Sequence, residues 1–170
     1  MQVLKVNDNI VYGSQGICKV EDIIERDFTG SMNKYYVLKP IQDKNSTIYV
    51  PVNNTSLISR MRRLLSEEEI YQMIKEISGE KTDWTEDKNE RKEKYKKIFE
   101  QGDCVEIMKM IKNIYVHQQE QEKQGRKLHL IDEQFFKKAE KILYHEFAFV
   151  LKMEPEKVLP FILEQVQTDN

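Results

Sequence analysis

Short apolar runs separated by turn residues fill the first sixty positions of the chain. Apolar and polar residues partly alternate along these runs, as they do in strands that bury one face. Gly13, Gly16 and Gly30 lie between runs, where a tight turn favours a residue without a Cβ. Five strands are predicted, over residues 9–12, 17–24, 34–38, 47–52 and 56–59. This arrangement predicts a small, bent antiparallel sheet or barrel.

The apolar pattern changes period after Ser66 and becomes helical. Ser66 followed by Glu69 is a capping-box signature that predicts a helix start, and Gly79 predicts the end of that helix. Further helices are predicted over residues 87–99 and 103–121, from Asp132 as an N-cap, and from Pro155 onward. The chain is therefore predicted to have an α+β fold, with a β domain over residues 1–62 and an all-α domain over residues 66–170.

Two prolines restrict how the sheet is built. Pro40 and Pro51 both follow apolar strand residues, and neither has an N–H to donate to a ladder. We therefore expect them at strand ends, at bulges or on an edge strand. An open edge near residues 47–51 has two interpretations, because it is either protected against pairing or used to dock a partner strand.

Charge and motifs exclude several function classes. Residues 1–60 carry seven cations and six acids, and residues 61–170 carry twenty and twenty-three, so a nucleic-acid partner would have to be contacted by local patches. His145-Glu146 lacks the second histidine of a zinc-protease motif, and His117 and His129 are isolated. We find no phosphate-binding loop and no Cys/His metal spacing. We expect neither an enzyme nor a cofactor or metal site.

Cysteine usage and hydropathy indicate the compartment. Cys18 and Cys104 are far apart within apolar patterns, which is typical of buried, reduced thiols in a cytoplasmic protein. No apolar run approaches the roughly 20 residues needed to span a bilayer. We expect a cytoplasmic protein with no membrane contact.

Trp84 is the only tryptophan, and it lies between a polar run and a charge-dense stretch. One interpretation is that its indole caps a small apolar cluster at the start of a helix. The other is that a large flat side chain is displayed among cations, ready to wedge against a base step of DNA. The second interpretation predicts that Trp84 is substantially exposed.

Several segments follow one another in a characteristic order: residues 8–20, residues 34–38, residues 48–52, Trp84, residues 101–103 and residues 139–143. Their order and spacing resemble those of the CarD family of bacterial transcription regulators. The N-terminal module is also similar to the RNA polymerase-interacting domain of the transcription-repair coupling factor. The resemblance extends over nearly the whole chain, and it is carried by order and spacing rather than by any single motif.

The resemblance implies a Tudor-like β domain that docks on the RNA polymerase β subunit, partly by strand addition. Arg26 aligns with a polymerase-contacting arginine of the family, whereas Tyr49 stands where many members carry a second arginine. The implied polymerase-binding residues are Arg26, Ile48, Tyr49, Val50 and Pro51.

The resemblance also implies that Trp84 wedges into the minor groove at the upstream edge of the promoter bubble and stabilises the open complex. Glu86 and Asp87 stand where some members have arginines. Lys88, Arg91 and Lys92 are candidates to restore phosphate contacts, with Lys138 and Lys141 as a second patch.

Two function classes remain open from the sequence. One is a polymerase-bound initiation factor that contacts promoter DNA, weakly when alone and as a monomer. The other is a protein-interaction adaptor that binds polymerase through the β domain and makes no DNA contact.

Overall fold

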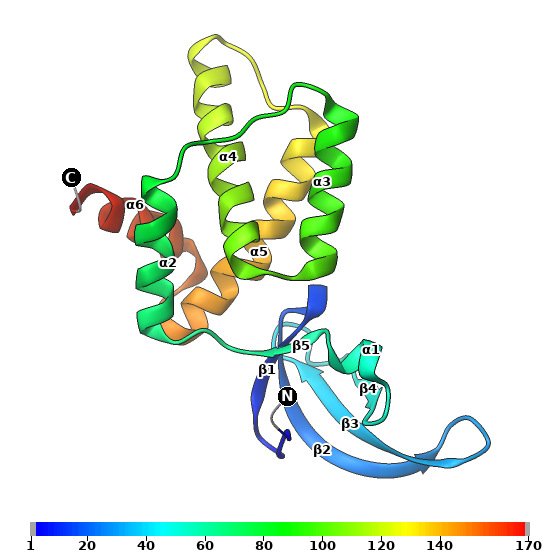
Figure 1. The fold of residues 1–170 in the computed structure, drawn as a ribbon. Helices are drawn as coiled ribbons and strands as arrows, with labels where there is room; N and C mark the ends of the chain where they lie inside the picture. Colours follow the sequence, from blue (N-terminus) through cyan, green and yellow to red (C-terminus); the bar gives the residue numbers. More distant parts are fainter. Residues whose placement is uncertain (1–2, 169–170) are drawn as a thin grey trace. The chain divides into compact units, whose positions relative to one another are not determined.

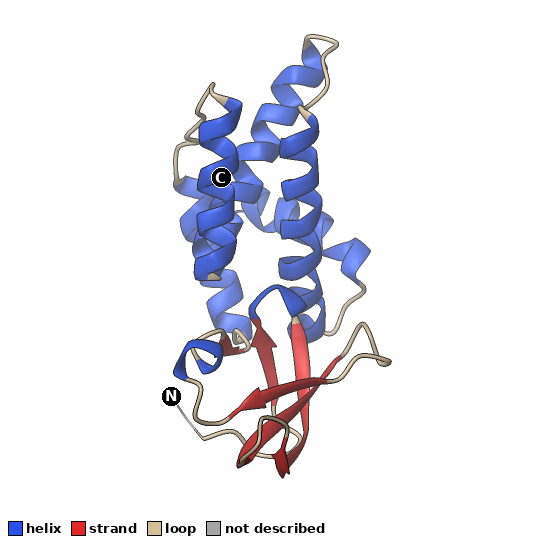
Figure 2. Cartoon of the chain, turned by 90° about the vertical axis from the view of Figure 1, so that its right-hand side faces the viewer, coloured by secondary structure: helices blue, strands red, loops and turns tan. Residues whose placement is uncertain are grey.

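The computed structural model describes residues 3–168. The chain divides between Leu64 and Leu65 into two compact units, which are treated separately below. The first unit contains the strands β1 to β5 and the second contains the helices α2 to α6 (Figures 1 and 2). The predicted α+β class is confirmed.

The first unit is built on one antiparallel sheet. Its strands are β1 (Asn9–Tyr12), β2 (Ile17–Asp27), β3 (Met32–Pro40), β4 (Ile48–Pro51) and β5 (Met61–Arg63). Their order across the sheet is β4-β3-β2-β1-β5, so β4 and β5 are the edges and the sheet is open rather than closed into a barrel. Strands β2 and β3 form a long, curved hairpin (Figure 1). A register shift between Val20 and Asp22 interrupts their pairing and bends β2, as a bulge does.

One face of this sheet carries an apolar core. Strand alternation sends every second side chain to this face. The buried members are Ile10, Tyr12, Cys18, Val20, Tyr36, Leu38, Val50 and Met61. The Cys18 thiol is free, and burial raises its pKa to about 11. The thiol is therefore protonated at neutral pH and unreactive, as the sequence predicted for a structural cysteine.

The predicted strand over residues 56–59 is wrong. Residues Thr55–Ile58 form a helical turn, α1, and the fifth strand comes later, at Met61–Arg63. The Asn54 side chain accepts a hydrogen bond from the Leu57 amide, 3.1 Å away, and so caps the turn. Such local side-chain hydrogen bonds compete with sheet pairing.

The second unit packs helices around a shared apolar core. They are α2 (Glu67–Gly79), α3 (Lys88–Gln101), α4 (Cys104–Lys123), α5 (Leu130–Leu151) and α6 (Val158–Thr168). A short 3₁₀ turn, η2 (Pro155–Lys157), precedes α6. Helix α4 packs against α2, α3 and α5, and α6 packs against α2 and α5 (Figure 1). Among the described residues, none of the helices combines the length and apolar character that crossing a bilayer requires.

Of the five predicted helix starts, three are confirmed and one is wrong, and the fifth, Pro155, begins the 3₁₀ turn η2 that leads directly into α6. Ser66 closes a capping box with Glu69, and Asp87 and Asp103 cap α3 and α4. Asp132 is not an N-cap, because His129 holds that position and Asp132 lies inside the first turn of α5. Its side chain is fully buried, since it pairs with α3 rather than with its own helix.

Removing the Ser66 cap should cost measurable stability. The Ser66 hydroxyl accepts from the Glu69 amide at 3.2 Å, and the Glu69 carboxylate accepts from the Ser66 amide at 2.8 Å. We expect Ser66→Ala to lower the free energy of unfolding by about 1 kcal/mol, measured by urea denaturation. Ser78→Ala is the control, because the Ser78 hydroxyl only donates to the Lys75 carbonyl. Equal losses in both variants would contradict the capping role.

Candidate functional site

The outer edge of β4 presents backbone groups that β3 does not use. Tyr36 is paired with Val50 and Val37 with Tyr49, and the Val52 amide donates to the Lys34 carbonyl at 2.9 Å. Hydrogen-bonded pairs alternate along an antiparallel ladder. The backbone N–H and C=O groups of Val50 and Ile48 therefore point toward β3, whereas the backbone groups of Tyr49 and Pro51 point outward.

Within β4, this alternation leaves Tyr49 as the one residue that turns both an N–H and a C=O outward. Pro51 is the other outward-facing residue. It has no N–H, and its carbonyl already accepts from the Asn54 amide at 3.1 Å. The expectation that Pro51 would lie on an edge strand is confirmed. A partner strand that pairs with this edge would depend on the Tyr49 amide.

Aromatic side chains lie beside this edge. The Phe28 ring contacts the rings of Tyr35 and Tyr49, with centroids 5.0 and 5.2 Å apart. Phe28 and Tyr49 are 50% and 44% exposed, whereas Tyr35 is buried. Arg26 is exposed and pairs with Asn33, so strand alternation puts it on the same sheet face as Tyr35. The sequence reasoning missed Phe28, whose signal was an apolar residue in an otherwise polar turn.

Trp84 lies in the connection between α2 and α3 and is only partly buried against the helical core. Its indole stacks on the imidazole of His117 from α4, with ring centroids 3.7 Å apart and planes inclined by 11°. The Arg91 guanidinium carbon lies 4.6 Å from the centre of the same indole. The expectation of a substantially exposed indole is therefore wrong. The ring is held at the surface by flat neighbours rather than displayed freely.

Polar contacts from α4 fix the backbone before Trp84. The Lys112 ammonium donates to the carbonyls of Ile77, Ser78 and Glu80 at the end of α2. The Asn113 side-chain oxygen accepts from the Asp83 amide at 3.1 Å. A cation near these carbonyls satisfies groups that the helix end leaves without intrahelical partners.

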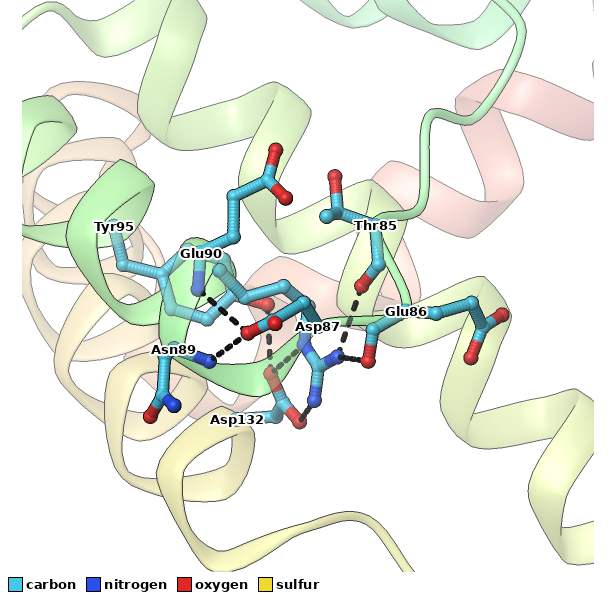
Figure 3. Close-up of polar contacts among 8 residues, drawn as sticks. Thr85, Glu86, Asp87, Asn89, Glu90, Tyr95 and Asp132 are labelled. Atoms are coloured by element: carbon cyan, nitrogen blue, oxygen red, sulfur yellow. Dashed lines mark hydrogen bonds and ion pairs between the residues drawn. The ribbon is translucent and has the colours of Figure 1, made fainter.

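Contacts from α3 fix the backbone after Trp84, and Figure 3 shows this group. Arg91 donates to the carbonyls of Thr85 and Glu86, each at 2.9 Å. Its Nε and Nη2 atoms donate to the two carboxylate oxygens of Asp132, at 2.8 and 2.7 Å. The Tyr95 hydroxyl also donates to Asp132, at 2.8 Å. The hydrogen bond to Asp132 raises the pKa of Arg91, and burial raises the pKa of Tyr95.

Arg91 therefore differs from the exposed phosphate-contacting cation expected from the sequence. Its side chain is 4% exposed, and four of its hydrogen bonds are made inside the protein. A phosphate contact would break the pairing with Asp132 and leave a buried carboxylate without its cation, which is costly.

The four expected lysines are all exposed, and they lie on two helices. Lys88 and Lys92 are one turn apart on α3, and Lys138 and Lys141 are neighbours on one face of α5. The Lys138 ammonium lies 4.7 Å from the centre of the Phe99 ring on α3. Phe99 lies eleven residues after Lys88 on α3, which corresponds to about 16 Å along the helix axis. Lys138, which lies over Phe99, is therefore far from Lys88 along this helix.

Acids balance the cations beside Trp84. A hollow of about 260 Å³ is lined partly by Trp84, and several lysines border it. Lys94 pairs with Asp83 at 3.0 Å, and Lys109 lies 3.4 Å from both Glu80 and Glu106. Asp87 caps α3, and the amides of Glu90 and Asn89 lower its pKa. The surface near the indole is therefore of mixed charge. Among the described residues, no cluster of His, Cys, Asp and Glu could hold a metal ion.

Comparison with protein families gives two matches that together span most of the chain. Residues 4–64 match the CarD-like/TRCF RID domain, and residues 69–162 match the CarD C-terminal domain. The chain belongs to the CarD family. No curated protein sequence matches it. A CarD family protein with this N-terminal module is a transcription regulator that interacts with RNA polymerase.

Proposed function

We propose that this CarD family protein docks on the β subunit of RNA polymerase through its β unit and stabilises the promoter open complex with Trp84. The observation that carries the proposal is the setting of the indole. A single tryptophan is held at the surface of the helical unit by a stacked ring, a cation and two backbone clamps. These contacts restrict the movement of the ring, which favours its use as a wedge against a base step.

The docking half of the proposal rests on the open edge of β4. Strand addition obtains affinity from backbone hydrogen bonds and specificity from neighbouring side-chain pockets. The outward Tyr49 amide supplies the hydrogen bond. The exposed rings of Phe28 and Tyr49 and the exposed Arg26 supply contacts for side chains of the partner.

The proposed contact with DNA needs little positive charge on the helical unit. Holding an unstacked base step apart offsets roughly a few kcal/mol of unstacking. A protein anchored on polymerase meets the promoter at an effective concentration of about millimolar when the connection is short. Lys88, Lys92, Lys138 and Lys141 then supply phosphate contacts, and Arg91 supports the indole instead.

A second candidate function is an adaptor that binds polymerase and leaves DNA untouched. The observation in its favour is the exposed acids near Trp84, among them Asp83, Glu86 and Asp87. Phosphates would be repelled by these carboxylates wherever no lysine lies closer. Both candidates bind polymerase, so only a DNA readout separates them.

Free protein should bind duplex DNA weakly and with a shallow salt dependence. Each neutralised phosphate contributes about 0.9 to the slope of log affinity against log salt, so contacts by the four lysines would give a slope of about three to four. The measurement is a salt titration of a labelled promoter fragment, with free protein and with the polymerase complex.

Two results of this titration would contradict the proposal. Tight binding by free protein with a steep slope would indicate an autonomous DNA-binding protein. No effect on DNA even in the polymerase complex would favour the adaptor. Lys88→Ala with Lys92→Ala should reduce the slope by about two, and Lys75→Ala on α2 is the control for a lysine outside the proposed contact.

A further inference from the structure

The ion pair between Arg91 and Asp132 is a costly way to hold two helices together. Taking two charges out of water costs free energy, which their attraction repays only with good geometry and additional hydrogen bonds. Well-packed apolar side chains in the same places are often as stabilising or more so. The side chains are 4% and 1% exposed, so the pair is largely shielded from water. The pair also fixes the position of the groups that are hydrogen-bonded to Arg91.

Apart from Asp132, Arg91 contacts Trp84 and the two residues that follow it. Thr85 and Glu86 follow Trp84 directly in the chain, and both give their carbonyls to Arg91 Nη1. The same guanidinium lies over the indole. Asp132 therefore orients Arg91 with both carboxylate oxygens, and Arg91 orients the backbone after Trp84 and one neighbour of its ring.

Asp132 is itself held firmly. It accepts three hydrogen bonds from Arg91 and Tyr95. It also lies in the first turn of α5, where the helix dipole favours a negative charge. Because Asp132 is fixed, its two hydrogen bonds from Arg91 hold the guanidinium in one orientation. An arginine without such a partner would sample many rotamers.

We propose that Asp132 is a positioning residue, which acts through Arg91 to set the orientation in which Trp84 meets DNA. This inference rests on the proposed function of Trp84. Its physical reason is preorganisation, because a side chain that is already fixed loses less conformational entropy when it binds.

The test is Asp132→Asn, which keeps the size of the side chain and removes its charge and one acceptor oxygen. Trp84 is the only tryptophan, so the fluorescence of the chain at tryptophan wavelengths reports this residue alone. We expect Asp132→Asn to raise the acrylamide quenching of Trp84 and to shift its emission. Tyr95→Phe removes one hydrogen bond to Asp132 and keeps the ring, so we expect a smaller change in the same direction.

Glu146→Gln is the matched control. Glu146 is a second buried carboxylate on α5, 1% exposed, and it accepts from the Leu65 amide at 2.9 Å. Removing the Glu146 charge should destabilise the helical unit without changing the quenching of Trp84. Glu146→Gln and Asp132→Asn are both measured well below their unfolding temperatures. Equal quenching in the two variants, or no change in Asp132→Asn and Tyr95→Phe, would overturn the proposal.

The functional arm measures the lifetime of the polymerase–promoter open complex with each variant bound. We expect Asp132→Asn to reduce the lifetime about fivefold, a coupling of ordinary size between two sites, and Glu146→Gln to leave it unchanged. An unchanged lifetime with Asp132→Asn, when Trp84→Ala shortens it, would overturn the positioning role alone. An unchanged lifetime with Trp84→Ala would overturn the proposed function and, with it, any positioning of Trp84 toward DNA.

Discussion

Trp84→Ala is expected to abolish most of the open-complex stabilisation that the protein provides. If the indole offsets a few kcal/mol of base unstacking, and about 1.4 kcal/mol is a tenfold change in an equilibrium, the lifetime of the open complex should fall at least about tenfold. The measurement is the decay of preformed open complexes after addition of a competitor. Polymerase binding by the variant should be unchanged.

The control must separate the loss of a DNA contact from the loss of stability. Truncating a buried tryptophan costs about 3–5 kcal/mol, and Trp84 is only partly buried, so we expect a smaller loss in the free energy of unfolding. Tyr71→Ala removes another aromatic side chain of the helical unit, one that is 45% exposed on α2. If Tyr71→Ala shortens the lifetime as much as Trp84→Ala does, the indole has no specific part in stabilising the complex.

Tyr49→Pro is expected to eliminate binding to polymerase. The substitution removes the outward N–H of β4 and leaves unchanged Ile48 and Val50, the two residues of β4 whose backbone N–H and C=O groups point toward β3. Strand addition cannot proceed in register across a missing central donor. The measurement is the affinity of the full-length chain for polymerase, with the fold of the variant verified by circular dichroism.

Two further variants make this prediction specific to the edge. Tyr49→Ala keeps the amide and loses the ring, so it should weaken binding much less than Tyr49→Pro. Ile48→Pro removes an inward-facing donor and should instead destabilise the sheet itself. Undiminished binding by a folded Tyr49→Pro variant would show that polymerase is not bound through this edge.

Local sequence signals located most of the helices and strands. The capping box at Ser66 and the aspartates at positions 87 and 103 each lie at a helix start, because their side chains satisfy amides of their own first turn. Residues 56–59 were predicted as a strand because apolar residues there continue the earlier pattern. Asn54 overrides that pattern with one hydrogen bond to Leu57.

The contacts around Trp84 could not be predicted from the sequence, since they depend on residues distant in the chain. Asp132 is forty-one residues from Arg91, and an aspartate near a predicted helix start is most simply interpreted as a cap. His117 follows Trp84 by more than thirty positions and carries no motif. An arginine among lysines and acids also gives no sign that it is buried. Tertiary pairing decides these roles, and a single sequence does not display it.

The contact between Trp84 and DNA is tested most directly by crosslinking. A photoreactive benzophenone amino acid is introduced at position 84, and the protein is irradiated in complex with RNA polymerase and promoter DNA. The account predicts crosslinks to DNA at the upstream edge of the melted region, dependent on both polymerase and an open promoter. Crosslinks to polymerase alone, with the protein fully bound, would contradict it and identify the chain as an adaptor.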